Sequence, residues 1–256
     1  MIVTRTPFRI SFFGGGTDYP EYFEKHGGAV LATAIDKSLF LSVTKFYSEL
    51  FDYSIRLAYS KVECAKSLDE IEHVPFREIL RHQGITRDTE VSIAAELPSF
   101  SGTGSSSSFV VGLLNTLAAY RGQFVRPMDL AYRAIDIERN VLKEHVGCQD
   151  QVPAAMGGLS LVEFRRVDDI VVHRLPIASK DILELEQHLL LVFTGLRRRA
   201  SVHAAKQIAR VEINVDRLRR MRGMVDEAYE ALVGTRSLER FGRLLGTRSE
   251  ERRVGK

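Results

Sequence analysis

The 256-residue chain contains only two cysteines, Cys64 and Cys148, and no long apolar run. Two cysteines are too few for a disulfide framework or a cysteine zinc site. The segment from Met1 to Pro7 lacks the apolar core of a signal peptide, and no apolar run approaches the roughly 20 residues that span a membrane. We therefore expect a cytoplasmic protein without a membrane partner. A hydrophobic content of 45% is enough for the core of one large domain or two modest ones.

Charge is distributed unevenly along the chain. Residues 197–256 contain 16 Lys and Arg against 8 Asp and Glu, whereas the first 196 residues contain 20 against 25. A basic end can indicate nucleic-acid binding. The stretch from Arg217 to Arg222, however, offers no aromatic residues on which bases could stack. A solvated helix face, or a surface that meets anionic metabolites, explains the charge, and we expect no nucleic-acid partner.

Strand-like segments dominate the first half of the chain, and helical spacing dominates its end. Because the two kinds of segment do not alternate regularly, the pattern predicts an α+β architecture rather than a doubly wound sheet. The expected strands are 8–13, 29–35, 39–45, 55–59, 91–95, 159–164, 170–175 and 189–194. The expected helices are 70–83, 105–120, 128–145, 180–187 and most of the chain after 201. We expect two domains, 1–180 and 181–256.

The clearest candidate for a ligand site is the segment from Pro98 to Ser108, which is rich in glycine and serine. It precedes a run whose apolar residues fall at 109, 110, 113, 114, 117 and 118, the spacing of a helical face. A helix start presents free backbone N–H groups to an anion, and glycines allow close approach. A flexible linker is the alternative, but linkers rarely run straight into an apolar helix. The residues expected to bind nucleotide phosphates are Pro98, Ser101, Gly102, Thr103, Gly104, Ser105, Ser106 and Ser107.

Spacing excludes other phosphate loops. A Walker loop needs a lysine after its last glycine, and a dinucleotide loop needs a third glycine where Ser107 stands. The segment resembles instead the ATP loop of the GHMP family of small-metabolite kinases, which reads Pro, a few residues, then Gly-x-Gly-Ser-Ser-Ala. Ser107 in place of alanine is a mild departure. The resemblance implies an ATP-dependent kinase.

A second motif runs from Thr6 to Tyr19, where a strand-like segment ends in three glycines. A purely structural explanation is a strand followed by a turn, with Asp18 capping the next segment. It resembles the first motif of the sugar kinases in the GHMP family, which implies that Gly15, Gly16, Thr17 and Asp18 contact the sugar. Galactokinase-like sequences have Glu-His where this chain has two glycines. That difference argues against galactose and leaves room for a larger sugar.

Glu138 falls on the apolar stripe of an expected helix, because Ala131, Ile135 and Glu138 step by four and three. A carboxylate on such a stripe needs a partner, and a buried ion pair is one explanation. The resemblance implies a Mg²⁺ ligand instead, together with the hydroxyl of Ser106 or, as second choice, Ser105. Oxygen ligands are what this hard cation prefers.

Asp150 follows a glycine turn and could simply be a turn residue. Its Gly-x-x-Asp context resembles that of the catalytic aspartate of the family. The resemblance implies that Asp150 accepts the proton of the attacking hydroxyl. It also implies that Arg9 keeps Asp150 ionised and steadies charge on the transferred phosphoryl group. We expect Cys148 to be a small buried neighbour, not a nucleophile.

Clustered arginines follow the expected strand 189–194. The guanidinium fork matches phosphate geometry, so Arg198 is a candidate receptor for a substrate phosphate, with solvated surface charge as the alternative. The stretch 193–200 is similar to the Thr-Gly-x-x-Arg-x-Ala element of the heptose 7-phosphate kinase branch of the family. The resemblance as a whole covers about residues 2–245.

The resemblance implies an ATP- and Mg²⁺-dependent kinase that phosphorylates the anomeric hydroxyl of D-glycero-D-manno-heptose 7-phosphate, giving the 1,7-bisphosphate. The implied fold is an N-terminal domain with a left-handed βαβ unit and a ferredoxin-like C-terminal domain. The alternatives are a kinase for another sugar, such as fucose, and a non-catalytic protein that binds sugar phosphates. The oligomeric state stays open.

The end of the chain lacks one feature of the family. No glycine-rich third motif follows the basic helices, and the stretch 246–256 is polar without apolar periodicity. We therefore expect a C-terminally truncated kinase with an incomplete C-terminal domain, a foreign or frayed tail and impaired activity.

Overall fold

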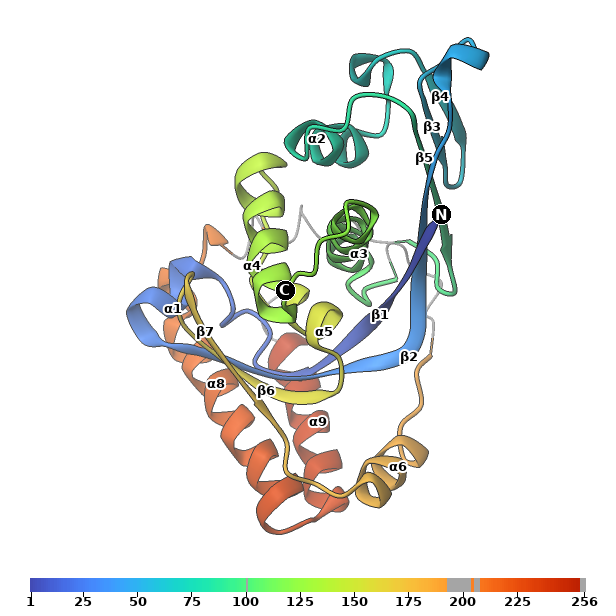
Figure 1. Cartoon of the computed structure of the whole chain (residues 1–256). Coiled ribbons are helices and arrows are strands. Elements are labelled where there is room, and N and C mark those ends of the chain that lie inside the picture. Colours follow the sequence, from blue (N-terminus) through green and yellow to red (C-terminus); the bar gives the residue numbers. More distant parts are fainter. Residues whose placement is uncertain (100, 193–203, 205–207, 254–256) are drawn as a thin grey trace. The chain divides into compact units, whose positions relative to one another are not determined.

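The computed structural model describes residues 1–99, 101–192, 204 and 208–253, with side chains described up to residue 248. The chain divides into two compact units. Unit 1 comprises Met1–Phe8, Ile35–Glu144 and Asp150–Met156, and unit 2 comprises Arg9–Ala34, His145–Gln149 and Gly157–Lys256. Both draw on distant segments because the long strands β1 (Ile2–Phe13) and β2 (Gly28–Lys45) run through both (Figure 1). The expected division at residue 180 cuts the chain once, whereas these two units each combine several segments, and that domain boundary stays a prediction.

Unit 1 contains a mixed sheet in the order β4-β3-β5-β2. Residues 39–45 of β2 pair with β5 in antiparallel fashion, β5 is parallel to β3, and β3 is antiparallel to β4. The three shorter strands are β3 (Ile55–Ala58), β4 (Val62–Ala65) and β5 (Thr89–Ala95). The parallel pair requires a crossover, which α2 provides between β4 and β5. The α+β class predicted from the sequence is therefore confirmed.

The helices of unit 1 lie on one side of its strands (Figure 1). They are α2 (Val74–His82), α3 (Ser105–Tyr120), α4 (Pro127–Asp136) and α5 (Gln151–Met156), with a π-helical turn at Ile137–Val141. Helix α3 is buried over most of its length and packs closely on the first two strands. A β-carbon on Gly112 would come within 2.7 Å of the Thr6 hydroxyl and 2.8 Å of Leu41 Cδ1. Only glycine permits that approach.

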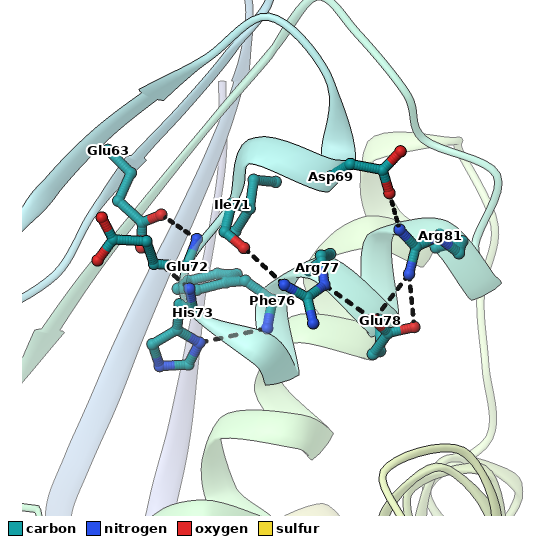
Figure 2. A network of polar contacts seen from close by, with 9 residues as sticks. All are labelled: Glu63, Asp69, Ile71, Glu72, His73, Phe76, Arg77, Glu78 and Arg81. Atoms are coloured by element: carbon teal, nitrogen blue, oxygen red, sulfur yellow. Dashed lines mark hydrogen bonds and ion pairs between the residues drawn. The ribbon is translucent and has the colours of Figure 1, made fainter.

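A polar network holds the start of α2 beside β4 (Figure 2). Buried Glu63 accepts hydrogen bonds from the backbone N–H groups of Glu72 at 2.6 Å and His73 at 3.2 Å, and from the Tyr59 hydroxyl at 2.5 Å. Burial opposes the charge of Glu63, but these hydrogen bonds outweigh it and lower its pKa. His73 Nδ1 in turn accepts the N–H of Phe76 at 3.3 Å, and burial lowers the His73 pKa. Half-buried His73 therefore caps α2, and buried Glu63 holds the backbone just before the helix.

Unit 2 contains the first half of β2 between β1 and a hairpin. Residues 28–33 of β2 pair antiparallel with β6 (Leu159–Arg166), which pairs antiparallel with β7 (Asp169–Arg174). The strands expected at 159–164 and 170–175 are thus confirmed. The described helices of unit 2 are α1 (Pro20–His26), α6 (Ser179–Gln187), α8 (Val215–Tyr229) and α9 (Leu238–Arg253). Helices α8 and α9 lie side by side (Figure 1), and the Phe241 ring of α9 packs edge-on against Phe12 and Phe13 at 5.4 Å.

Several expected elements differ in the structure. The strands expected at 29–35 and 39–45 form one continuous strand, β2, and β4 is an additional strand. The helix expected over 128–145 ends as α4 at Asp136 and continues only as the π-helical turn. The expected strand 189–194 is wrong for residues 189–192, which are not in a strand and are exposed. An apolar run forms a strand only where it finds a pairing edge and burial.

The end of the described chain is helical. Helix α9 continues to Arg253, so residues 246–253 extend a helix and do not fray from it.

Among the described residues, no helix is both long and apolar enough to cross a membrane.

Candidate functional site

The expected phosphate loop lies in unit 1, between β5 and α3. Helix α3 begins at Ser105, as the sequence predicts, and its first residue follows Gly104. Gly102 and Gly104 have φ angles of +82° and +76°, a left-handed conformation that favours glycine. Gly104, the N-cap residue, has no side chain with which to cap the start of the helix. The backbone N–H groups of a long helix are therefore presented at a glycine-rich turn, which is the arrangement that binds anions.

The four serines that open α3 have different surroundings. Ser105 is half-buried, Ser106 is exposed, and Ser107 and Ser108 are buried. Ser107 Oγ donates to Glu138 Oε1 at 3.0 Å, and Ser108 Oγ donates to the Pro7 carbonyl at 2.9 Å. The last two serines therefore fix the helix start to its surroundings. Ser106 is the one of the four serines that is exposed to solvent.

Glu138 is fully buried in the π-helical turn that follows α4. Its carboxylate accepts hydrogen bonds from Ser107 and from Gln151 Nε2, the latter at 2.5 Å. Burial raises the pKa of Glu138 to about 8, and the charges of Asp150 and Glu144 add to the effect. Glu138 forms no ion pair with any described residue, so the buried ion pair that the sequence left open is not found among these residues.

The chemistry at Glu138 fits a hard cation. A buried carboxylate with acidic neighbours and only neutral hydrogen-bond donors gains most from a nearby positive charge. The described residues contain no group of three or more His, Cys, Asp or Glu that could hold a metal. Mg²⁺ bound here would therefore depend on Glu138, hydroxyls, nucleotide phosphates and water, which is how proteins commonly bind it.

Gln151 is a site residue that the sequence reasoning missed. It is fully buried at the start of α5, and its amide donates to Glu138. The available signal was its place directly after Asp150, within a segment already singled out. Asp150 itself is half-buried, and its carbonyl accepts the N–H of Ala154 at 3.4 Å. Unit 1 thus brings Ser107, Glu138, Asp150 and Gln151 together from three helical segments.

The expected sugar motif lies in unit 2, in the turn after β1. Gly14 has a φ of +86°, and a β-carbon there would come within 1.9 Å of the Ala29 carbonyl oxygen. The hydroxyl of Thr17 is buried, 2.8 Å from the Gly14 carbonyl and 2.9 Å from that of Ala29. The structure therefore places Thr17 where it holds the turn, and its assignment to the sugar stays a prediction.

Asp18 connects this turn to the segment 147–149 of the same unit. It is 1% exposed, and its Oδ1 accepts the N–H of Gly16 at 2.8 Å. A β-carbon on Gly147 would come within 1.8 Å of Asp18 Oδ2, so only glycine fits at position 147. The backbone N–H of Cys148 donates to the Asp18 carbonyl at 2.9 Å. Cys148 is buried, as expected.

The predicted roles of two other residues, Arg9 and Arg198, stay predictions. Arg9 lies half-buried on β1 in unit 2, whereas Asp150 belongs to unit 1, so their pairing stays a prediction. Arg198 lies outside the described residues.

The comparison with known families now defines the class of the protein. Residues 64–158 match the family described as GHMP kinases N terminal domain. This stretch includes the start of α3, Glu138 and Asp150, which are the parts of the site in unit 1. This part of the chain therefore matches a GHMP kinase N-terminal domain, and the predicted resemblance is confirmed.

Individual relatives are kinases of sugars and sugar phosphates. The chain is 30% identical over 209 residues to D-glycero-alpha-D-manno-heptose 7-phosphate kinase of Campylobacter jejuni, covering 78% of this chain and 61% of that protein. It is 25% identical over 288 residues to L-fucokinase/L-fucose-1-P guanylyltransferase of Bacteroides fragilis, covering 98% of this chain and 30% of that protein. The chain thus spans less than two thirds of either relative.

The fold is shared with solved kinases. The crystal structure of a D-glycero-D-manno-heptose 1-phosphate kinase from Bacteroides thetaiotaomicron matches with a TM-score of 0.82 at 22% identity. The match covers 99% of this chain and 79% of that one. At this identity the likeness establishes the α+β fold of a GHMP kinase.

Proposed function

We propose that this chain is an ATP-dependent sugar kinase that phosphorylates the anomeric hydroxyl of D-glycero-D-manno-heptose 7-phosphate to the 1,7-bisphosphate. The observation that carries the proposal lies in unit 1. There, the start of α3 after Gly104 is hydrogen-bonded through Ser107 to Glu138, whose pKa is raised by burial and further by the charge of Asp150. The similarity to the heptose 7-phosphate kinase supports the choice of substrate.

The nucleotide would bind at the start of α3. Backbone N–H groups there would donate to the phosphate oxygens of ATP, and the left-handed Gly102 and Gly104 would let the backbone come close. Glu138 and the exposed hydroxyl of Ser106 would hold Mg²⁺ beside the phosphates. When bound, Mg²⁺ neutralises charge that develops on the transferred phosphoryl group.

The acceptor would be activated by Asp150. Its carboxylate would take the proton of the anomeric hydroxyl, while the Arg9 guanidinium favours the ionised state of that carboxylate. The turn at Gly15, Gly16 and Asp18 would position the sugar. Arg198 would bind the phosphate at the other end of the heptose, because a guanidinium and a phosphate form charge-assisted hydrogen bonds.

Release of ADP across a panel of acceptors tests the proposal. The panel contains D-glycero-D-manno-heptose 7-phosphate, the unphosphorylated heptose, L-fucose and D-galactose, each with ATP and Mg²⁺. We expect the heptose 7-phosphate to give the highest kcat/KM. L-fucose is included because of the similarity to the fucokinase. A higher kcat/KM for L-fucose would show that the substrate is fucose and not the heptose 7-phosphate. Binding of sugars without turnover of any of them would show that the chain is a binding protein and not a kinase.

A further inference from the structure

Several polar side-chain atoms in unit 2 are buried without a hydrogen-bond partner among the described residues, and two of these atoms lie close together. They are Ser11 Oγ, on β1, and Gln149 Oε1, in the segment that precedes α5. Both lie beside Gly15. A β-carbon on Gly15 would be 4.0 Å from Ser11 Oγ, and 3.6 Å and 3.9 Å from Gln149 Nε2 and Oε1. Buried polar groups in proteins nearly always have a partner, so two such atoms facing one point need an explanation.

Gly15 differs from the glycines on either side of it. Gly14 and Gly16 have φ angles of +86° and +105°, which favour glycine, whereas Gly15 is not among the residues with positive φ. A β-carbon at Gly15 would meet its neighbours only at ordinary van der Waals distances. Neither the backbone nor the packing of the described residues therefore requires glycine at position 15. A bare α-carbon there keeps open the space that an alanine methyl group would fill.

We propose that Ser11 and Gln149, with the bare α-carbon of Gly15 between them, form a subsite for one hydroxyl group of the sugar. This inference rests on the proposed function. A hydroxyl group is both donor and acceptor, so it can donate to Gln149 Oε1 and accept from Ser11 Oγ, satisfying both buried atoms. The subsite thereby helps to determine which sugar is accepted.

The two side chains that would bind the ligand favour a neutral hydroxyl over a phosphate or carboxylate. Both proposed ligand-binding side chains are neutral. The carboxylate of Asp18 lies against Gly147, two residues from Gln149, and would repel an anionic group. A sugar without the matching hydroxyl would leave two buried polar atoms unsatisfied, and sites of this kind reject such analogues strongly.

The test compares alanine substitutions at two glycines and one serine. Gly15→Ala places a methyl group in the proposed subsite, and we expect the KM for the sugar to rise about 10-fold or more. Ser11→Ala removes one hydrogen bond, for which we expect a rise of about 3- to 10-fold. The KM for ATP and the melting temperature should stay near wild type in both variants. Gly223→Ala is the matched control, because a β-carbon there meets nothing within 4 Å on α8.

A set of monodeoxy analogues of the accepted sugar sharpens the test. One analogue should bind wild type more weakly by a factor at least as large as that of Ser11→Ala, because it loses the hydrogen bonds to both Ser11 and Gln149. In the Ser11→Ala variant the same deoxy change should cost less than in wild type, because only the hydrogen bond to Gln149 remains to be lost. This loss of discrimination distinguishes a hydroxyl subsite from a general disturbance of the turn. Gln149 is left unchanged, because a substitution there could displace Asp150.

The outcomes separate this inference from the proposed function. If wild type phosphorylates the sugar and both variants keep its KM, the subsite is refuted and the kinase proposal stands. Equal losses for every deoxy analogue in wild type and in Ser11→Ala would also refute the subsite. If wild type releases no ADP and binds none of the sugars, the proposed function fails, and the subsite fails with it.

Discussion

Two buried glutamates of unit 1 use the same side chain in opposite ways. Glu63 accepts hydrogen bonds from two backbone N–H groups (Figure 2) and from a tyrosine hydroxyl, which lower its pKa although burial opposes this. Glu138 accepts from one serine and one glutamine and has acidic neighbours, and burial raises its pKa to about 8. The charge of Glu63 is satisfied by the fold itself. Glu138 lies in a region that would be stabilised by an added cation, which is the property expected of an active site.

The largest effect is expected at the acidic neighbour of Glu138. Asp150→Asn removes the proposed general base, so turnover should fall by about 10²- to 10⁴-fold. ATP should still bind, because the start of α3 is unchanged. Steady-state ADP release and a nucleotide titration measure the two quantities. Asp136→Asn, at an exposed position at the end of α4, is the matched control and should keep its turnover. Near-normal turnover of Asp150→Asn would remove this residue from the mechanism.

The second effect concerns the cation proposed for the Glu138 region. Ser106→Ala and Glu138→Gln should each raise the Mg²⁺ concentration needed for half-maximal activity by about 10-fold or more. The KM for the sugar should change little, because the sugar motif lies on other segments. Glu24→Gln, on an exposed position of α1, is the control. Unchanged Mg²⁺ titrations in both variants would show that the cation is held by other groups.

The third effect concerns the free energy of unfolding, which should respond differently to substitution of Glu63 and of Glu138. Glu63→Gln replaces one accepting oxygen with a donor and leaves a buried N–H group facing it, so we expect a loss of about 1–3 kcal/mol in the free energy of unfolding. Glu138→Gln should cost less at pH 7, because the native carboxyl is largely protonated there and glutamine is a neutral analogue of it. Urea unfolding at pH 7 measures both. The reverse order would contradict the distinction between the two glutamates.

The smallest effect is expected at His73, in the Glu63 region. Burial lowers the His73 pKa, against the opposing charge of Glu63, so the native state binds fewer protons than the unfolded state. Stability should therefore be full above about pH 6.5, the unfolded value, and fall as pH drops through the window below it. His73→Asn keeps an N-cap acceptor that does not titrate, and should flatten this fall. Urea midpoints from pH 7.5 to pH 5 measure it, and an equal slope in both proteins would exclude His73.

Much of the architecture could be predicted from local pattern. The start of α3 at Ser105, the hairpin of β6 and β7 and the helix α6 follow from apolar spacing and turn residues. The run 189–192 shows the limit of this reasoning, because its composition is strand-like and yet it is not in a strand. Whether an apolar run pairs depends on an available sheet edge, which a local pattern does not contain.

The candidate site was also predicted only in part. The glycine-rich loop, Glu138 and Asp150 carry signals in their spacing and in their resemblance to one family. Gln151 had no such signal of its own, because a glutamine in a short helix is compatible with many roles. Its assignment depends on a hydrogen bond to a residue 13 positions away.

The amino-acid sequence by itself determined the α+β class, the helix start after the glycine-rich loop and the resemblance to one kinase family, because these depend on local spacing and on short motifs. Only the tertiary structure decided which serine contacts Glu138, that this carboxyl has no ionic partner among the described residues, and that Ser11 and Gln149 face Gly15. These properties arise from burial and from contacts between distant segments. Desolvation and hydrogen bonding set the charge of a carboxyl, and both depend on the folded surroundings.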